Sequence, residues 1–175
     1  MTIASPDELW VFAYGSLMWR PGFDFVEVKP AVLIGCHRAL CVYSHRWRGT
    51  EEMPGLVLGL DWGGSCRGVA FRVEPDFVDQ TLTYLREREM VNRVYFETMR
   101  PVRFADGSRT LALTYVADRT HLQYAGKLDR EARLEIIRNS AGQAGSNRDY
   151  VLNTVEHLRA LGASDPELDW LCARL

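Results

Sequence analysis

LWVFAYGS, residues 9–16, is an apolar and aromatic run that stops at a Gly-Ser pair. Such a run predicts a buried strand, and the Gly-Ser pair predicts the turn that ends it. Two more apolar stretches follow at residues 30–44 and 55–60. Because Gly63-Gly64 precedes another strand-like run at 66–73, residues 55–73 are predicted to form a β-hairpin. The first half of the chain therefore reads as strands.

A second hairpin is marked by Asp106-Gly107, which lies between strand-like residues 102–104 and 110–116. Asp-Gly at this place is typical of a two-residue type I′ turn. Glycines also occur inside the strand patterns, where they predict the bulges and bends that a small closed barrel needs at its corners. These glycines are Gly35, Gly55, Gly59 and Gly68.

Helical patterns occur at residues 75–90 and 129–140 and again towards the C-terminus. Ser146 is a predicted N-cap, and Gly162 stands where a helix ends in the left-handed conformation. Ser164-Asp165-Pro166-Glu167 opens a short last helix, with Ser164 as its cap. The helix that Ser146 caps has a predicted apolar face of Tyr150, Val151, Val155, Leu158 and Leu161. We predict one α+β domain over residues 1–175, a small mixed or closed β-barrel with flanking and C-terminal helices.

Composition narrows the class of function. The 175 residues include 21 basic and 23 acidic side chains, so no cationic field exists for nucleic acid or an anionic membrane. No apolar run is long enough to span a membrane, and residues 1–9 are acidic where a signal peptide is basic. We therefore expect a cytoplasmic protein, with the oligomeric state open and a monomer allowed. The cysteines are expected to be reduced thiols and the dispersed histidines to bind no metal: Cys36, Cys41, Cys66, Cys172, His37, His45, His121 and His157.

The helix predicted at residues 75–90 has an acidic side chain in line with its apolar stripe. Glu89 lies about 20° from the line of the stripe at roughly 100° per residue, whereas Glu87 lies about 180° away. Arg86 and Arg88 fall about 80° to either side and flank it. The stripe itself consists of Val78, Leu82 and Leu85.

A carboxyl group in that place has the properties of a general base. Burial raises its pKa, and the negative end of the helix dipole acts in the same direction, so proton transfer near neutral pH is favoured. Two other interpretations of Glu89 stay open. It pairs with a buried arginine, or the helix ends one turn early and leaves it in water.

The turn after the first strand is the second candidate for function. Ala13-Tyr14-Gly15-Ser16-Leu17-Met18 breaks an apolar strand with no polar run around it. Glycine allows backbone to approach a ligand closely, and successive amides in such a turn can hold an anion such as a carboxylate. The alternative is an ordinary turn that only ends the strand.

At these two places the chain resembles the ChaC-type gamma-glutamylcyclotransferases, the glutathione-specific branch of the cyclotransferase-like fold. The resemblance follows the order of the chain and covers nearly all of it. Residues 90–95 lack the glycines that many relatives have there, so we expect the pocket rim to differ. The matching stretches are Trp10 to Phe23, Arg48-Gly49-Thr50 with Pro54-Gly55-Leu56-Val57-Leu58, Arg88-Glu89-Met90, Tyr124-Ala125-Gly126 and Gly145-Ser146-Asn147-Arg148-Asp149-Tyr150.

The resemblance implies an intramolecular aminolysis that needs no cofactor or metal. The free α-amine of glutathione attacks its own gamma-carbonyl, which closes 5-oxoproline and releases Cys-Gly. Glu89 is then the catalytic base, because the ammonium must lose a proton before it attacks. The substrate-binding residues are Ala13, Tyr14, Gly15, Ser16, Leu17 and Met18, with Tyr150 as a further candidate.

Other functions stay open on the sequence. The substrate is alternatively another gamma-glutamyl amino acid or amine, or the chain is a non-catalytic regulatory binding protein. Arg86-Glu87-Arg88-Glu89 faintly resembles the acidic helix of Nudix pyrophosphohydrolases, but Val91-Asn92-Arg93 supplies no further carboxylates for magnesium. A Cys36-His37 nucleophile pair is disfavoured, since neighbours on a strand point to opposite faces.

Overall fold

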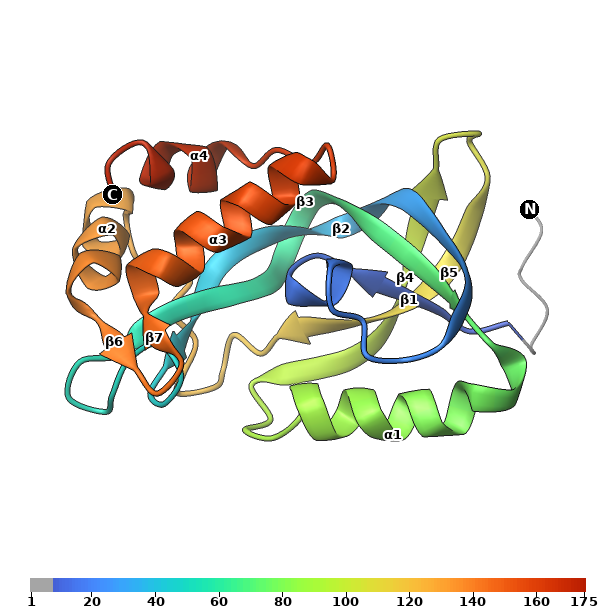
Figure 1. Ribbon diagram of the computed structural model, residues 1–175, viewed down its shortest axis with the longest axis horizontal. Helices are drawn as coiled ribbons and strands as arrows, with labels where there is room; N and C mark the ends of the chain where they lie inside the picture. The colour runs from blue at the N-terminus through green and yellow to red at the C-terminus, as the bar shows by residue number, and fades with distance from the viewer. Residues whose placement is uncertain (1–7) are drawn as a thin grey trace. The chain divides into compact units, whose positions relative to one another are not determined.

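The computed structural model describes residues 8–175, so the acidic start of the chain lies largely outside the described residues. The chain divides into two compact units, described separately below. The first unit comprises residues 8–37 and 60–117, and the second comprises residues 38–59 and 118–175. Two long strands, β2 (Phe25–Ser44) and β3 (Gly55–Val73), have residues in both units (Figure 1).

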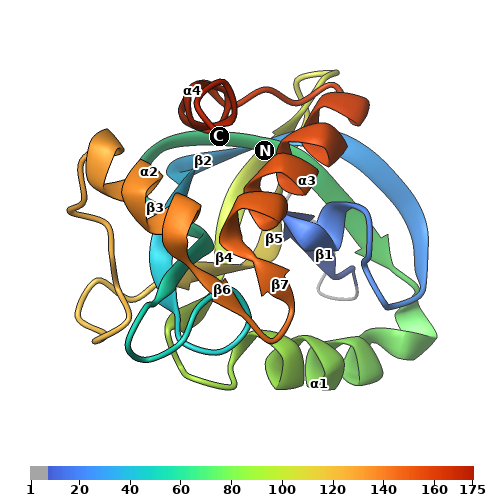
Figure 2. The same ribbon diagram turned by 60° about the vertical axis from the view of Figure 1, so that its left-hand side comes forward.

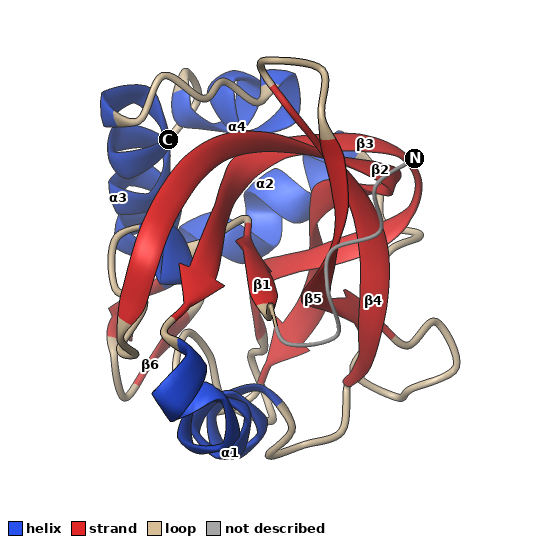
Figure 3. Ribbon diagram, turned by 90° about the vertical axis from the view of Figure 1, so that its right-hand side faces the viewer, coloured by secondary structure: helices blue, strands red, loops and turns tan. Residues whose placement is uncertain are grey.

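Five strands close into a barrel in the order β1-β3-β2-β4-β5. Besides β2 and β3, these are β1 (Trp10–Ala13), β4 (Tyr95–Phe104) and β5 (Arg109–Ala117). The barrel closes because β5 pairs in parallel with both β1, at Val11–Leu113, and β3, at Leu60–Val116. Figure 3 shows these strands curving around a common interior. The predicted closed barrel in an α+β fold is confirmed.

The buried strand predicted at the start of the chain is also confirmed. All four residues of β1 are buried, and the strand pairs antiparallel with β3 from Trp10–Arg72 to Ala13–Val69. Only glycine fits at position 68, because a Cβ there would overlap the carbonyl oxygen of Ala13. This close approach holds the end of β1, and therefore the turn that follows it, against β3.

The predicted hairpin at residues 55–73 is wrong. This segment is one continuous strand of 19 residues, β3. Gly63 and Gly64 have φ of +100° and +71°, so they deform the strand locally where a turn was expected. The strand runs on past them because β1 and β2 are its neighbours in the sheet, and Nδ1 of His37 on β2 lies 2.9 Å from the Gly63 carbonyl oxygen.

The second predicted hairpin exists as β4 and β5, but its turn type is not the predicted one. Gly107 has φ of +84°, whereas Asp106 is not left-handed as a type I′ turn requires. The Gly107 amide donates to the Phe104 carbonyl (3.1 Å) and the Phe104 amide to that of Ser108 (2.9 Å). This is a three-residue loop with a left-handed glycine. The Asp106 carboxylate fixes it by accepting from the Ser108 amide at 2.9 Å.

The second unit carries the C-terminal helices, seen together in Figure 2. The N-cap at Ser146 acts as predicted, and the helix before it is capped by the Asp129 side chain. The last helix is capped by Asp165 rather than Ser164, because the Asp165 carboxylate reaches the amides of residues 167 and 168. Leu161 does not belong to the buried face, since it follows the end of its helix and is 47% exposed. The elements are α2 (Arg130–Asn139), β6 (Ala141–Gly142), β7 (Gly145–Ser146), α3 (Asn147–Ala160) and α4 (Pro166–Cys172).

Within residues 8–175, no helix is long and apolar enough to cross a membrane. No disulfide joins any of the four cysteines, Cys36, Cys41, Cys66 and Cys172.

Candidate active site

The turn after β1 is a short 3₁₀ helix, η1 (Ser16–Met18). The Met18 amide donates to the Gly15 carbonyl at 2.9 Å, and the Arg20 amide donates to the Ser16 carbonyl at 2.8 Å. Leu17 and Met18 are each only 6% exposed and anchor the turn, whereas Ser16 is exposed. The amides at the start of a helix have no acceptor within it, so this turn presents backbone N–H groups next to the Ser16 hydroxyl.

The helix that carries Glu89 is α1 (Val78–Glu89), preceded by the 3₁₀ turn η2 (Pro75–Phe77). Glu89 is its last residue, and 18% of its side chain is exposed, whereas Glu87 is exposed to solvent. Leu85, one turn earlier on the stripe, is fully buried. The predicted difference between the two glutamates is therefore confirmed, and the helix does not end early.

Two opposing effects act on the Glu89 carboxyl group. Burial raises its pKa above the ordinary value, because the charged form loses water. Attraction and hydrogen bonding by the Arg88 guanidinium act against that shift, with Nε 3.2 Å from Oε1, but they do not cancel it. The arginine pairing that the sequence left open is thus present, and the pKa of the Glu89 carboxyl group is raised all the same.

Arg88 also joins Glu89 to the turn. Its Nη2 donates to the Ser16 hydroxyl at 2.7 Å, and its Nη1 donates to the Arg20 carbonyl at 3.1 Å and to the Tyr84 hydroxyl at 2.9 Å. The two places that the sequence singles out are therefore brought together within the first unit, through a side chain that the sequence analysis did not select.

A second network lies on the other flank of α1. Arg86 makes a two-pronged contact with Glu97 of β4, at 2.8 Å to Oε1 and 2.9 Å to Oε2. The Tyr115 hydroxyl of β5 donates to the same carboxylate at 3.0 Å. Hydrogen bonds from Arg86 and, to a smaller extent, from Tyr115 lower the pKa of the Glu97 carboxyl group. Burial raises that of the Tyr115 phenol, and the charges of Glu97 and Glu89 add to the shift. Tyr115 therefore lies near enough to sense Glu89.

Tyr150 belongs to the second unit, where its hydroxyl accepts from the Leu58 amide at 3.0 Å and Arg48 stacks over its ring. Asn147, from the same matching stretch, is fully buried and bonds both backbone groups of Leu56 at 2.7 Å. These contacts give both side chains a structural role between α3 and β3. Substrate binding by Tyr150 stays a prediction.

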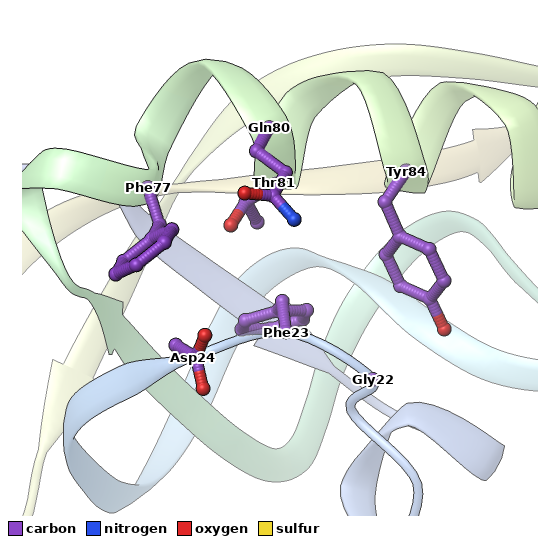
Figure 4. Close-up of a pocket in the computed structure, with 7 residues that line it drawn as sticks. All are labelled: Gly22, Phe23, Asp24, Phe77, Gln80, Thr81 and Tyr84. Atoms are coloured by element: carbon purple, nitrogen blue, oxygen red, sulfur yellow. The ribbon is translucent and has the colours of Figure 1, made fainter.

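A pocket of about 190 Å³ lies between α1 and the segment that follows η1. Figure 4 shows the Tyr84 ring at one end of it, with the hydroxyl directed towards Gly22. The pocket contains none of the predicted site residues, but Tyr84 links its wall to Arg88. It is lined by Gly22, Phe23, Asp24, Phe77, Gln80, Thr81 and Tyr84. No group of three potential metal ligands occurs among residues 8–175.

A family model described as ChaC-like protein matches residues 9–174. The chain belongs to the ChaC-like family. The match includes both the η1 turn and Glu89, so the resemblance noted on the sequence is confirmed over nearly the whole chain.

Curated relatives of this ChaC-like chain carry enzyme names. It is 35% identical over 166 residues to the glutathione-specific gamma-glutamylcyclotransferase of Escherichia coli, covering 94% of this chain and 72% of the relative. It is 33% identical over 163 residues to the human glutathione-specific gamma-glutamylcyclotransferase 1, covering 90% and 72%.

A solved structure shares the fold. The crystal structure of a glutathione-specific gamma-glutamyl cyclotransferase from yeast superposes with a TM-score of 0.83, covering 94% of each chain at 20% identity. The ChaC-like barrel described above is therefore the fold of that enzyme.

Proposed function

We propose that the protein is a gamma-glutamylcyclotransferase that converts glutathione to 5-oxoproline and Cys-Gly. The names of the curated relatives support the reaction and the substrate. The observation in this chain that carries the proposal is Glu89, a largely buried carboxyl group at the end of an apolar helix stripe with a raised pKa. An amine nucleophile needs a base that removes the proton of its ammonium form, and a buried carboxylate with a raised pKa accepts that proton more readily than an exposed one.

The proposed reaction makes one C–N bond and breaks another. Glu89 accepts a proton from the α-ammonium of the glutamyl group, and the neutral amine adds to the gamma-carbonyl carbon. The tetrahedral intermediate then collapses, its oxyanion reforms the carbonyl, and the bond to the cysteine nitrogen breaks. Glu89 returns its proton to that nitrogen, then takes the second proton that the ring nitrogen has carried since the addition and passes it to the freed amine. The lactam N–H is left neutral, Cys-Gly leaves as an ammonium, the carboxylate is regenerated and no external acid or base is consumed.

The η1 turn is the proposed binding site for the glutamyl end. The amides and hydroxyl around Ser16 meet the α-carboxylate or the developing oxyanion, and the buried side chains of Leu17 and Met18 keep the turn rigid. Because the Met18 amide already donates to Gly15, the amides that precede it are the proposed donors. Holding amine and carbonyl at reacting distance supplies much of the acceleration.

We also propose that the enzyme works in the cytoplasm. Its thiol cysteines suit a reducing compartment, as does a substrate that is itself a thiol.

The test is product analysis with matched variants on one helix. Wild type, Glu89→Gln and Glu87→Gln are incubated with reduced glutathione and a chelator, and 5-oxoproline and Cys-Gly are quantified. We expect both products in equal amounts from wild type and from Glu87→Gln, and a loss of at least about 100-fold in Glu89→Gln, the range that a general base contributes.

Other outcomes point elsewhere. Full activity in Glu89→Gln would remove that residue from its role. No product from wild type would direct the assay to gamma-glutamyl amino acids and amines, and failure with all of them would favour a binding protein. Inhibition by the chelator would contradict the metal-free reaction.

A further inference from the structure

Arg88 makes several polar contacts at the candidate site, and the proposed reaction assigns it no role. Each of its three guanidinium nitrogens has a partner. Nη2 bonds Ser16, Nη1 bonds the Arg20 carbonyl and the Tyr84 hydroxyl, and Nε lies beside Glu89. With 27% of its side chain exposed, Arg88 lies largely beneath the surface.

These partners come from the turn η1, from the segment behind it and from the last turns of α1. A guanidinium is planar and its N–H groups point in fixed directions, so contacts made at once also fix their partners relative to one another. We propose that Arg88 is the positioning residue of this site: it holds the Ser16 turn against the end of α1 and the Glu89 carboxylate in one orientation. The roles of the Ser16 turn in binding and of Glu89 as base rest on the proposed function, whereas the contacts of Arg88 do not depend on it.

The charged groups around Glu89 determine how the loss of Arg88 would change the pKa of the Glu89 carboxyl group. Arg88 lies on the same helix, and Tyr115 approaches from β5 with its proton donated to Glu97 of β4. Glu97 is in turn neutralised by Arg86. Arg88 is thus the cation that opposes burial at Glu89, and its removal leaves burial unopposed.

Two substitutions separate geometry from charge. Arg88→Lys keeps the charge but presents it as a point, without the fork that reaches several partners. Arg88→Gln removes the charge as well. Arg103→Gln is the matched control, because it removes one exposed cation at the far end of β4.

The first measurement is the pH dependence of 5-oxoproline formation. We expect both Arg88 variants to raise KM for glutathione by about tenfold, since the turn is no longer held. Only Arg88→Gln should move the acidic limb of kcat/KM upward, by about one pH unit. Arg103→Gln should match wild type. An unmoved limb together with an unchanged KM would overturn the proposal, as would equal limbs in Arg88→Gln and Arg88→Lys.

The second measurement does not depend on turnover. Carboxyl-¹³C NMR titration, with the Glu89 signal assigned by its absence in Glu89→Gln, should show Glu89 titrating at higher pH in Arg88→Gln. Exchange of the Met18 and Arg20 amides should accelerate in both variants, because their acceptors lie in the turn. Unchanged titration and exchange would refute the inference. If wild type makes no 5-oxoproline, the proposed function fails, and these two readouts still decide the role of Arg88.

Discussion

A carboxyl group with a raised pKa weakens the fold at the pH where it is useful. The unfolded chain releases the Glu89 proton near pH 4.5, whereas the native state holds it to higher pH because the group is buried. Between these two values the native state binds more protons, so the contribution of Glu89 to stability is present at low pH and is lost as pH rises.

This predicts that Glu89→Gln changes the pH dependence of stability in a known direction. The free energy of unfolding of the variant, relative to wild type, should increase from pH 4 to pH 8, because the variant has no proton to lose. Urea unfolding at a series of pH values measures this difference, with Glu87→Gln as the control that should stay parallel to wild type. A difference that shrinks as pH rises would show that the pKa of Glu89 is lowered instead.

Periodicity alone distinguishes Glu89 from Glu87, and the structure confirms that difference. The role of Arg88 could not be predicted in the same way, although Tyr84 at i−4 is a visible helical neighbour. Its contacts with Ser16 and Arg20 join residues about 70 positions apart, and only the packing of η1 on α1 brings them within reach.

At the scale of elements, the hairpin of β4 and β5 shows that an error of one residue in the predicted turn changes the pairing along both strands. A two-residue turn at 106–107 would pair Glu97 with Val116, whereas the observed three-residue loop pairs Glu97 with Tyr115. A shift of one residue moves side chains to the opposite face of a strand. The hairpin itself was predictable from Asp106-Gly107. The hydrogen bond between Tyr115 and Glu97 was not, because the register of the predicted type I′ turn does not place these two residues opposite each other.

The strand β3 teaches a related point. Gly63-Gly64 has the composition of a turn, but left-handed glycines also occur inside a long strand that bends. The choice between bend and turn depends on which strands lie alongside, and that is information from the sheet rather than from the local sequence.

The segment between η1 and β2 supplies a prediction about packing. Gly22 has φ of +74°, and a Cβ there would overlap the Tyr84 hydroxyl. Gly22→Ala should cost about 1–2 kcal/mol for the left-handed backbone and a further ~1–3 kcal/mol for the overlap. Gly107→Ala is the control, because Gly107 has a similar φ of +84° and open space around it.

Urea unfolding of the two variants tests this. Equal losses of stability would mean that Tyr84 moves aside without cost. Because Tyr84 accepts from Arg88, Gly22→Ala should also raise KM for glutathione, whereas Gly107→Ala should not.

At the scale of the whole molecule, the prediction of one domain over the full chain is still to be tested. The two units share the continuous strands β2 and β3, so unfolding of one removes the pairing partners of the other. We expect a single cooperative transition in urea, the same by tryptophan fluorescence and by far-ultraviolet circular dichroism. Trp10, Trp19 and Trp62 lie in the first unit and Trp47 and Trp170 in the second, so fluorescence reports on both, whereas α2, α3 and α4 of the second unit dominate the helical signal. Two separate midpoints would contradict the single domain.

The path of the chain between the units has a genetic consequence. It passes from one unit to the other at residues 37–38, 59–60 and 117–118, so neither unit is encoded by one uninterrupted stretch. A single crossover between genes of two relatives cannot therefore exchange one whole unit and leave the other unchanged. Replacing one unit as a whole requires exchanges at all three points, so a chimaera that joins one relative's complete first unit to another's second needs three coordinated crossovers.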